Sequence, residues 1–503
     1  VTPIETEFGR KRAIDQSTCN KDYSCIKGFC PSFVEVSGAA LAKRSMDEAA
    51  LAARVAKLPL PPVVDVADGP QALLVTGIGG TGVLTVGAIL AMAAHLEGKA
   101  AKVLDQTGMA QKGGAVTSHI RIGADMAAIP SARLGTGQAD VVIACDLVVG
   151  SGPDVLALTH PGTRVLANED VVPTGEFQRN RNLDLSAARF LKAIGGRVDP
   201  ANVSALRAGA LATRLLGDSI FTNLMMVGFA AQQGLLPVGL DSVEEAIRLN
   251  GVAAKANLAA LSLGRLAAAG ADDLFALADA SPDTPAPPRT YAEVVESRVR
   301  LLTAWQDVAY AQGYRLFLAG IEGTLRARGL GDAEPLLAAL ARGLGRLMAY
   351  KDEYEVARLY SDPAFRSGLA DTFAGSPKLK VHLAPPLLAW RKDHKTGRPR
   401  KIAFGGWIFP AFGLLAKLKG LRGTMLDPFG FTAERRMERA LIGEYRALAE
   451  TIAAQVTRET MATAVELAAA ADLVAGYGPV KEAGVAAYRA RVAELLPRLT
   501  DAS

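Results

Sequence analysis

A glycine-rich turn, GIGGTG at residues 77–82, lies between the apolar run QALLVT and the helix-like stretch VLTVGAILAMAAHLEG at residues 83–98. Three of its glycines, Gly77, Gly79 and Gly82, fit the G-x-G-x-x-G pattern. Glycines at these positions permit a tight turn and let an anion approach the amides of the helix N-terminus. The pattern therefore predicts a buried parallel strand, a turn and a helix, with or without a bound ligand.

The alternation of strands and helices continues beyond this turn. Further strands are predicted at residues 100–105, 115–123, 140–148 and 163–168, and helices are predicted to dominate at residues 202–279. Strands that alternate with helices indicate an α/β sheet with helices on its faces.

A second glycine-rich loop separates the first two of these further strands. Gly108, Gly113 and Gly114 surround Lys112, and backbone amides beside a lysine can form an anion-binding nest. Because both loops follow neighbouring strands, we expect them to converge on one crevice that suits a pyrophosphate or a carboxylate.

The strand at residues 115–123 carries His119 and Arg121, which alternate with isoleucines and so share one face. This pattern fits two polar contacts to a ligand, and it equally fits a strand half exposed to water. Asp105, at the end of the preceding strand, stands about where a dinucleotide-binding fold places the acid that binds ribose.

Composition excludes several classes of function. A net charge of +5 over 503 residues is too small to indicate nucleic-acid binding. The most apolar late stretch, residues 402–418, is interrupted by three glycines and a proline, so we expect a soluble protein with no membrane-spanning segment. Four cysteines, three of them clustered, favour a reducing cytoplasm with a metal site over a disulfide framework.

Four prolines within residues 281–290 mark the clearest domain boundary. Five segments are expected: a cysteine module at 1–35, a helix and linker at 36–70, an α/β domain at 71–280, the proline-rich linker at 281–290 and mostly amphipathic helices at 291–503. In the second segment, Ser45 and Glu48 have the spacing of a capping box, which predicts Ser45 as the helix N-cap.

The stretch CNKDYSCIKGFCPSF at residues 19–33 holds three of the four cysteines, Cys19, Cys25 and Cys30. A tetrahedral zinc ion or a [4Fe–4S] cluster needs four ligands, so these thiols leave the set incomplete. A zinc site would have no histidine nearby, since the nearest is His95. The fourth cysteine, Cys145, lies in an apolar strand and is predicted to be a buried core thiol.

The two glycine loops in their context, GIGGTGVLTVGAILAMAAHLEGK and DQTGMAQKGGAVTSHIRIG, resemble the gamma domain of 2-oxoacid:ferredoxin oxidoreductases. The resemblance is greatest to the fused indolepyruvate ferredoxin oxidoreductases of bacteria. It continues in order through residues 217–238 and 244–265 into the C-terminal half, and so covers essentially the whole chain. It implies an α/β fold in which a Rossmann-like gamma domain follows a small iron–sulfur module and precedes a mostly α-helical C-terminal domain.

The resemblance also implies a role for the cysteine stretch. In this family a ferredoxin-like module with two clusters precedes the gamma domain, and residues 5–33 are similar to its second half. Cys19 and Cys25 would then bind one [4Fe–4S] cluster, while Cys30, which precedes proline, would bind its partner. Asp22 stands where such a run would have its middle cysteine, either as a carboxylate ligand or as a solvated acid.

The activity that the resemblance implies is oxidative decarboxylation of a 2-oxoacid, indolepyruvate or another aryl pyruvate, to an acyl-coenzyme A. Coenzyme A is the co-substrate, and iron–sulfur clusters pass electrons to ferredoxin. No stretch resembles a G-D-G…N-N thiamine site, so thiamine diphosphate and Mg²⁺ are expected on a missing part. We therefore expect a C-terminal portion or a split subunit that has a thiamine-binding partner and forms a homo-oligomer.

No catalytic residue is predicted in this chain. The predicted contacts to coenzyme A or to the substrate are Gly77, Gly79, Gly80, Gly82, Lys112, Gly113, Gly114, His119 and Arg121. The predicted metal ligands are Cys19, Asp22, Cys25 and Cys30. Asp218 and Asn223 lie in another family-like stretch, where a capping or interface role fits as well as a ligand contact. The basic stretch at residues 391–407 is interpreted as a packing turn, or as a contact for ferredoxin or coenzyme A.

Two rival functions stay open at this point. One is a non-catalytic electron-transfer or assembly subunit with a degenerate nucleotide-type domain. The other is a flavin-free NAD(P)-linked reductase that uses Gly77–Gly82 and Asp105. Tight binding of NAD(H) would favour the second.

Overall fold

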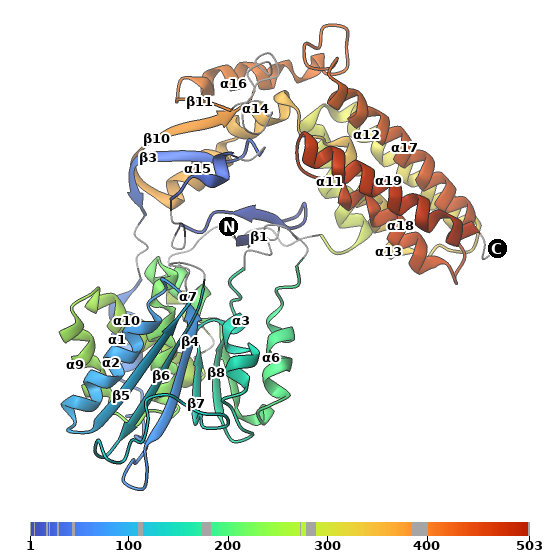
Figure 1. Cartoon of the computed structure of the whole chain (residues 1–503). Helices are drawn as coiled ribbons and strands as arrows, with labels where there is room; N and C mark the ends of the chain where they lie inside the picture. Colours follow the sequence, from blue (N-terminus) through green and yellow to red (C-terminus); the bar gives the residue numbers. More distant parts are fainter. Residues whose placement is uncertain are drawn as a thin grey trace. The chain divides into compact units, whose positions relative to one another are not determined.

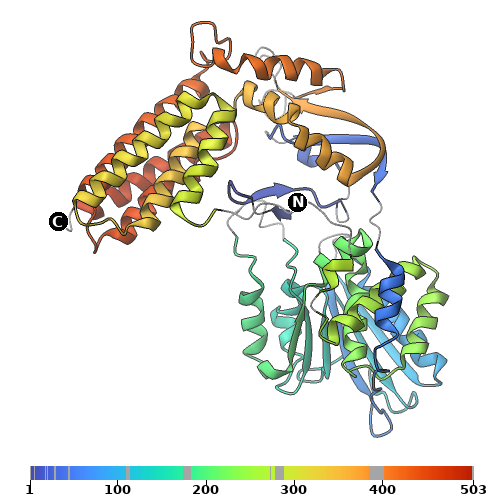
Figure 2. The same cartoon turned by 180° about the vertical axis from the view of Figure 1, so that it is seen from behind.

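The computed structural model describes residues 2–4, 6–16, 19, 21–27, 30–42, 46–108, 114–173, 183–271, 273–277, 288–384 and 401–500. The chain divides into two compact units, which are drawn in Figures 1 and 2. The first comprises Val1–Asn20 and Lys43–Thr284, and the second comprises Lys21–Ala42 and Pro285–Ser503. The second unit thus combines a short N-terminal segment with the C-terminal part of the chain.

A six-stranded sheet forms the centre of the first unit, in the strand order β5-β6-β4-β7-β8-β9. Its strands are β4 Gln71–Ile78, β5 Ala100–Thr107, β6 Ala115–Gly123, β7 Val141–Ala144, β8 Arg164–Asn168 and β9 Val203–Leu206. The last four in spatial order are parallel, whereas β6 runs antiparallel to both β4 and β5. The predicted α/β sheet is confirmed, with an antiparallel edge that the sequence pattern did not reveal.

Helices cover both faces of this sheet (Figure 1). Leu73 and Val75 of β4 belong to a core that includes α2, while Ala72 and Leu74 belong to a second core that includes α3 and α6. Because both faces of β4 are buried, its sequence is a continuous apolar run without polar alternation. The helices of this unit are α1 Glu48–Val55, α2 Val83–Leu96, α3 Leu147–Gly150, α4 Pro153–Leu156, α6 Ala187–Gly195, α7 Ala208–Leu216, α8 Thr222–Gln232, α9 Leu240–Asn250 and α10 Ala254–Ala268.

Two local predictions in the first unit need correction. The helix expected to start at Ser45 begins at Glu48, and its N-cap is Asp47, whose carboxylate accepts a hydrogen bond from the Ala50 amide at 2.9 Å. Aspartate is as good an N-cap as serine, so spacing alone did not decide between them. Helices take over only after β9, which adds one more parallel strand to the sheet.

The second unit contains a helical bundle and a small three-stranded sheet. The bundle helices are α11 Tyr291–Trp305, α12 Val308–Ala327, α13 Glu334–Met348, α17 Ala433–Gln455, α18 Met461–Ala469 and α19 Pro479–Thr500. The sheet has the order β11-β10-β3, in which β11 is Ile402–Phe404, β10 is Phe373–Leu383 and β3 is Val34–Leu41. Three further helices accompany it: α14 Glu353–Ser361, α15 Pro363–Thr372 and α16 Ile408–Lys417.

β3 corrects the predicted domain boundaries. Residues 36–41 were expected to belong to a helix and linker before the α/β domain, but they form a strand that pairs with β10 in the second unit. Residues 281–287 of the proline-rich linker predicted at 281–290 lie outside the described residues. Among the helices that are described, none has the length and apolarity needed to cross a bilayer.

Two glycines bring α8 and α10 unusually close. A Cβ atom on Gly264 would lie 1.9 Å from the carbonyl oxygen of Met225, and one on Gly228 would lie 2.0 Å from that of Leu261. Both obstacles are backbone atoms, which cannot rotate away as a flexible side chain could. The helix pair therefore depends on having no side chain at these two positions.

We predict that Gly264→Ala lowers the stability of the first unit by about 1–3 kcal/mol or more, because the extra methyl group must push the two helices apart. The matched control is Gly195→Ala in α6, where the nearest atom would be 4.0 Å away and an effect of at most about 0.5 kcal/mol is expected. Thermal unfolding of the three proteins measures the difference. Equal unfolding midpoints for all three would contradict the close packing of α8 and α10.

Candidate functional site

The carboxyl edge of the sheet in the first unit has the topology of a ligand site. From β4 the chain passes through α2 to β5 and β6 on one side, whereas β7 lies on the other side of β4. Ligands of open α/β sheets bind at the point where the strand order reverses in this way. The amide of Cys145, just after β7, donates to the Thr76 carbonyl of β4 at 2.9 Å, so the ends of the two strands are held together.

The glycines of the 77–82 turn serve different purposes. A Cβ atom on Gly77 would lie 2.5 Å from Cγ2 of Val83, so glycine lets α2 pack closely on the strand. Gly80 and Gly82 have φ angles of +85° and +91°, in the left-handed region that other residues rarely adopt. The turn therefore requires glycine at positions 77, 80 and 82 for reasons of its own geometry, which explains two of the three glycines of the pattern, Gly77 and Gly82, before any ligand is considered.

The structure brings the two glycine-rich loops together. The amide of Gly79 donates to the carbonyl of Gly114 at 2.7 Å, because Ile78 at the end of β4 pairs with Ala115 at the start of β6. Lys112 and Gly113 lie outside the described residues, so their contact with the first loop stays a prediction.

Asn223 supports the first loop from α8. Its side-chain amide donates to the Thr81 carbonyl at 2.7 Å, and the residue is only 3% exposed. α2 begins at Val83, and its N-cap Gly82 has no side chain to cap it. Among the described residues no side chain caps the first-turn amides, so they form the positive end of a helix dipole, which is the arrangement that binds phosphate or carboxylate.

Asp146 is a buried acid at the same edge that the sequence analysis did not select. One carboxylate oxygen caps α3 by accepting from the Val149 amide at 2.9 Å, and the other has no hydrogen-bond partner among the described residues. Burial raises the pKa of Asp146 to about 6, although the nearby backbone amides act in the opposite direction. The available signal was an aspartate directly after the apolar strand VVIAC.

Asn168 and Asp170 tie the end of β8 to the start of α7. The side-chain oxygen of Asn168 accepts from the Gly209 amide at 3.2 Å, and Asp170 accepts from the Ala210 amide at 2.6 Å. The Asn168 amide also donates to the Cys145 carbonyl at 3.1 Å. Asn168 and Asp170 therefore stabilise the carboxyl edge of the sheet through their own hydrogen bonds. The glycine loops are then the backbone at this edge that can contact a ligand.

His119 and Arg121 lie farther along β6 than a site at the loops would require. His119 is four residues from Ala115, or about 13 Å along the strand, and Arg121 is about 20 Å away. Both are buried, with Nδ1 of His119 accepting from the Leu134 amide and Arg121 donating to Gln138. Burial lowers the pKa of His119, and so do the charges of Arg133 and Arg121. The face that they share is packed under a loop, so the strand is not half exposed.

Asp105 lies on the edge strand β5 and is exposed. β6 separates it from β4, so it stands about 10 Å from the strand that carries the glycine turn. A ribose-binding acid belongs on the strand beside the turn. This geometry does not favour the dinucleotide interpretation.

The predicted metal ligands divide between the two units. Cys19 falls in the first unit, whereas Asp22, Cys25 and Cys30 fall in the second. Asp22 accepts hydrogen bonds from the amide and the hydroxyl of Ser24 at 2.9 and 2.8 Å, as expected of a local turn. No group of three or more metal-binding side chains gathers within the described part of the chain. Cys145 is buried, and burial raises its pKa to about 12, as predicted for a core thiol.

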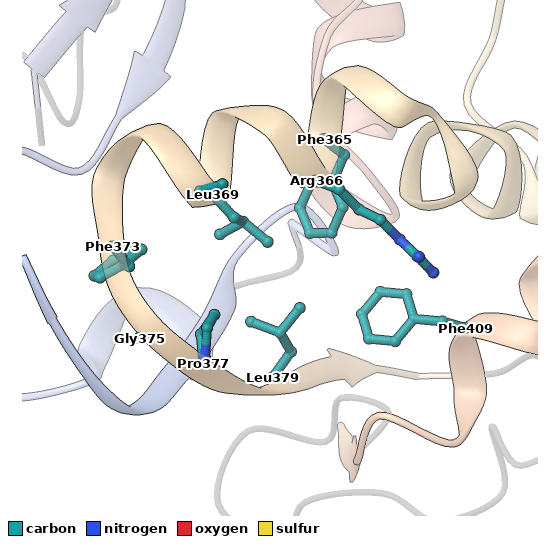
Figure 3. A pocket seen from close by; sticks show the side chains of 9 residues that line it. Phe365, Arg366, Leu369, Phe373, Gly375, Pro377, Leu379 and Phe409 are labelled. Carbon is teal, nitrogen blue, oxygen red and sulfur yellow. The ribbon is translucent and has the colours of Figure 1, made fainter. Parts of the chain in front are cut away.

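Asp218 has the capping role considered for it, since its carboxylate accepts from the Ile220 amide at 2.9 Å. The basic stretch at residues 391–407 lies outside the described residues up to position 400. In the second unit, a pocket of about 240 Å³ opens between α15, β10 and α16 (Figure 3). Its lining includes Phe365, Leu379 and Phe409, and among the described residues that line it Arg366 alone is charged and none is a general base or nucleophile.

We predict that ionisation of the buried Asp146 lowers the free energy of unfolding as the pH rises. A folded-state pKa of about 6, raised from 3.8, means that its contribution to stability is full below pH 3.8 and is lost as the pH rises through 6. Asp146→Asn keeps a capping oxygen and removes the titration. Urea unfolding from pH 4 to pH 8 is expected to favour the variant increasingly, by on the order of 2–3 kcal/mol at pH 8. A difference that stays constant with pH would contradict the buried ionisation.

Both units of the chain are similar in sequence to known protein families. Residues 72–267 match the family described as pyruvate ferredoxin/flavodoxin oxidoreductase, and residues 291–494 match a family of unknown function, DUF6537. The chain is 32% identical over 198 residues to the indolepyruvate oxidoreductase subunit IorB of Archaeoglobus fulgidus, covering 38% of this chain and 92% of that relative. It is 29% identical over 202 residues to the subunit of the same name from Pyrococcus horikoshii, covering 39% and 95%.

Two solved structures are also similar to the chain. The pyruvate oxidoreductase subunit PORC of Thermotoga maritima matches with 21% identity and a TM-score of 0.29, over 39% of this chain and 96% of that one. The gamma subunit of a keto/oxoacid ferredoxin oxidoreductase from Geobacter sulfurreducens matches with 21% identity and a TM-score of 0.29, over 40% and 99%. From the family match and the archaeal relatives, the chain belongs to the 2-oxoacid:ferredoxin oxidoreductase family, of which it carries the gamma-like part.

Proposed function

We propose that the chain is part of an enzyme that oxidises a 2-oxoacid with coenzyme A to an acyl-coenzyme A and passes the electrons to ferredoxin. Family membership supports the reaction type. The relatives are named as indolepyruvate oxidoreductase subunits, which supports an aryl 2-oxoacid as the substrate. Thiamine diphosphate, which supplies the carbanion chemistry of such a reaction, is assigned to a catalytic partner.

The paired glycine loops are the observation that carries this proposal. The Gly79–Gly114 hydrogen bond joins two backbone loops at one edge of the sheet, where α2 starts without a side-chain cap from the described residues. We assign Gly80, Gly82 and Gly114 to the binding of an anionic group, either a phosphate of coenzyme A or the carboxylate of the substrate. Gly79, whose amide already donates to the Gly114 carbonyl, holds the two loops together. Lys112 and Gly113 extend this assignment from the sequence, and Gly77 serves the packing of α2.

His119 and Arg121 are left out of the proposed contacts. Both side chains already have protein partners, and both lie toward the opposite end of β4 from the loops. Their role in the proposed site is to hold β6, and with it Gly114, in register.

An iron–sulfur cluster would supply one-electron transfer to the acceptor. We assign Cys19 and Cys25, with Asp22, to one such cluster and Cys30 to a partner cluster. The residues fit such a group in part, since thiolates are the usual ligands of these clusters and Lys401 donates from Nζ to the Cys30 carbonyl at 2.6 Å. The remaining ligands are assigned to another segment of the enzyme.

The rival functions are less well supported. An NAD(P)-linked reductase would need its ribose acid beside the glycine turn, and Asp105 lies beyond β6. A non-catalytic electron-transfer or assembly subunit would share the cysteines but would not need an anion site at α2. Binding of coenzyme A at that site therefore separates the proposal from both rivals.

We predict that Gly82→Asp weakens coenzyme A binding at least about tenfold, or about 1.4 kcal/mol. An aspartate at this position suits the helix dipole but repels an anionic ligand. The matched control is Gly98→Asp, at the other end of α2, where φ is also positive at +71° and no atom lies within 4 Å of an added Cβ. Calorimetric titration of the full chain with coenzyme A measures both dissociation constants. Equal affinities in the two variants would exclude the α2 site.

A further inference from the structure

Residues 30–42 are an integral part of the second unit. β3 pairs with β10 from Leu41 opposite Phe373 to Val34 opposite Val381, with one irregularity between Gly375 and Lys378. Figure 1 shows the two strands side by side, β3 in blue and β10 in orange. The Glu35 carboxylate adds an ion pair to Lys380 at 3.1 Å and a hydrogen bond to Nε2 of His382 at 3.2 Å. The strand that follows the cysteine stretch therefore depends on residues more than 300 positions later in the chain.

The peptide at Cys30 and Pro31 is held by side chains of the same C-terminal part. Lys401 donates from Nζ to the Cys30 carbonyl at 2.6 Å. The Tyr360 hydroxyl donates to the Pro31 carbonyl, and the Tyr360 ring is 6% exposed and stacks on Phe412. Two hydrogen bonds from distant segments thus fix the backbone on which the Cys30 thiol is mounted.

Polar groups also lie close to Cys30. The Lys401 ammonium is in contact with the Cys30 backbone through the 2.6 Å hydrogen bond, and burial lowers the pKa of Lys401. Burial raises the pKa of Tyr477, whose hydroxyl lies close to Ser32, two residues after Cys30. This hydroxyl makes no hydrogen bond of standard geometry among the described residues.

This arrangement is costly for a purely structural contact. A partly buried ammonium and a buried hydroxyl without a well-formed hydrogen bond both lose water that an apolar side chain would not need. Both costs are offset when Cys30 ligates a metal cluster of net negative charge. Such a group attracts the Lys401 ammonium and accepts a hydrogen bond from the Tyr477 hydroxyl. Tyr360, Lys401 and Tyr477 come from three separate segments, so their convergence on Cys30 is not a by-product of one turn.

We propose that the region of unknown function, residues 291–494, holds the cysteine segment in place. We call its contacts with residues 30–42 the seat. Its β10 and Tyr360 fix Cys30 in place, and its Lys401 and Tyr477 are positioning residues that set a cation and a hydroxyl beside the group that Cys30 binds. The seat does not depend on the proposed function. The effect of Lys401 on a bound iron–sulfur cluster does rest on the proposed function.

The seat is tested first without any metal. Tyr360→Phe and Lys401→Met each remove one hydrogen bond to the Cys30–Pro31 peptide, and amide hydrogen exchange of the full chain is expected to quicken about tenfold in residues 30–42. Tyr291→Phe and Lys351→Met, elsewhere in the second unit, are the matched controls and should leave that exchange unchanged. Unchanged exchange in both test variants would overturn the proposed seat.

The role of the Lys401 charge is tested on anaerobically purified protein with its partner present. Removing a cation beside a cluster disfavours the reduced, more negative state. Lys401→Met should lower the ratio of reduced to oxidised cluster about tenfold at a fixed potential, or about 59 mV for a one-electron couple. Lys401→Arg should restore the wild-type ratio, and Lys351→Met should not change it. An unchanged ratio in Lys401→Met would overturn the electrostatic role.

The two tests also separate this inference from the proposed function. Wild-type protein that binds no iron even with its partner would refute the iron–sulfur assignment, and the Lys401 effect on a cluster with it. The exchange measurement would still decide whether the C-terminal region holds the cysteine segment.

Discussion

The candidate site depends on one strand, β4, which is buried on both faces between β6 and β7. Its parallel neighbour β7 places Cys145 and Asp146 at its carboxyl end, and its antiparallel neighbour β6 begins there as well. Because β6 starts where β4 ends, the loop that precedes β6 must meet the turn that follows β4. The Gly79–Gly114 hydrogen bond joins the turn to the residue that precedes β6.

Much of the α/β unit could be predicted from local sequence. The apolar run of β4, the glycines of the turn and the periodicity of α2 are short-range signals, and all three elements lie where they were expected. The direction of β6 could not be predicted, because an alternating pattern does not encode whether a neighbour is parallel. The position of β6 between β4 and β5 separates Asp105 from β4, and the antiparallel direction of β6 carries His119 away from the loops.

Other features were missed for different physical reasons. The pairing of β3 with β10 joins residues separated by more than 300 positions, and no local pattern carries such a contact. Asp146 was visible only as an acid after a strand, and its raised pKa arises from burial that the fold creates. In contrast, the resemblance based on several ordered motifs identified the family correctly, and the family match lies at residues 72–267, where the two glycine loops stand. Residues 291–494 match a family of unknown function, and the hydrogen bonds of Tyr360 and Lys401 show that this region positions the Cys30–Pro31 peptide.

The most direct test of the account is a reconstitution of the complete reaction. The chain would be combined with a thiamine-binding partner, and ferredoxin reduction would be followed with indolepyruvate and coenzyme A, each component being left out in turn. The account predicts that reduction requires both chains and coenzyme A, and that acyl-coenzyme A forms in step with it. Equal reduction without this chain, or without coenzyme A, would contradict the account.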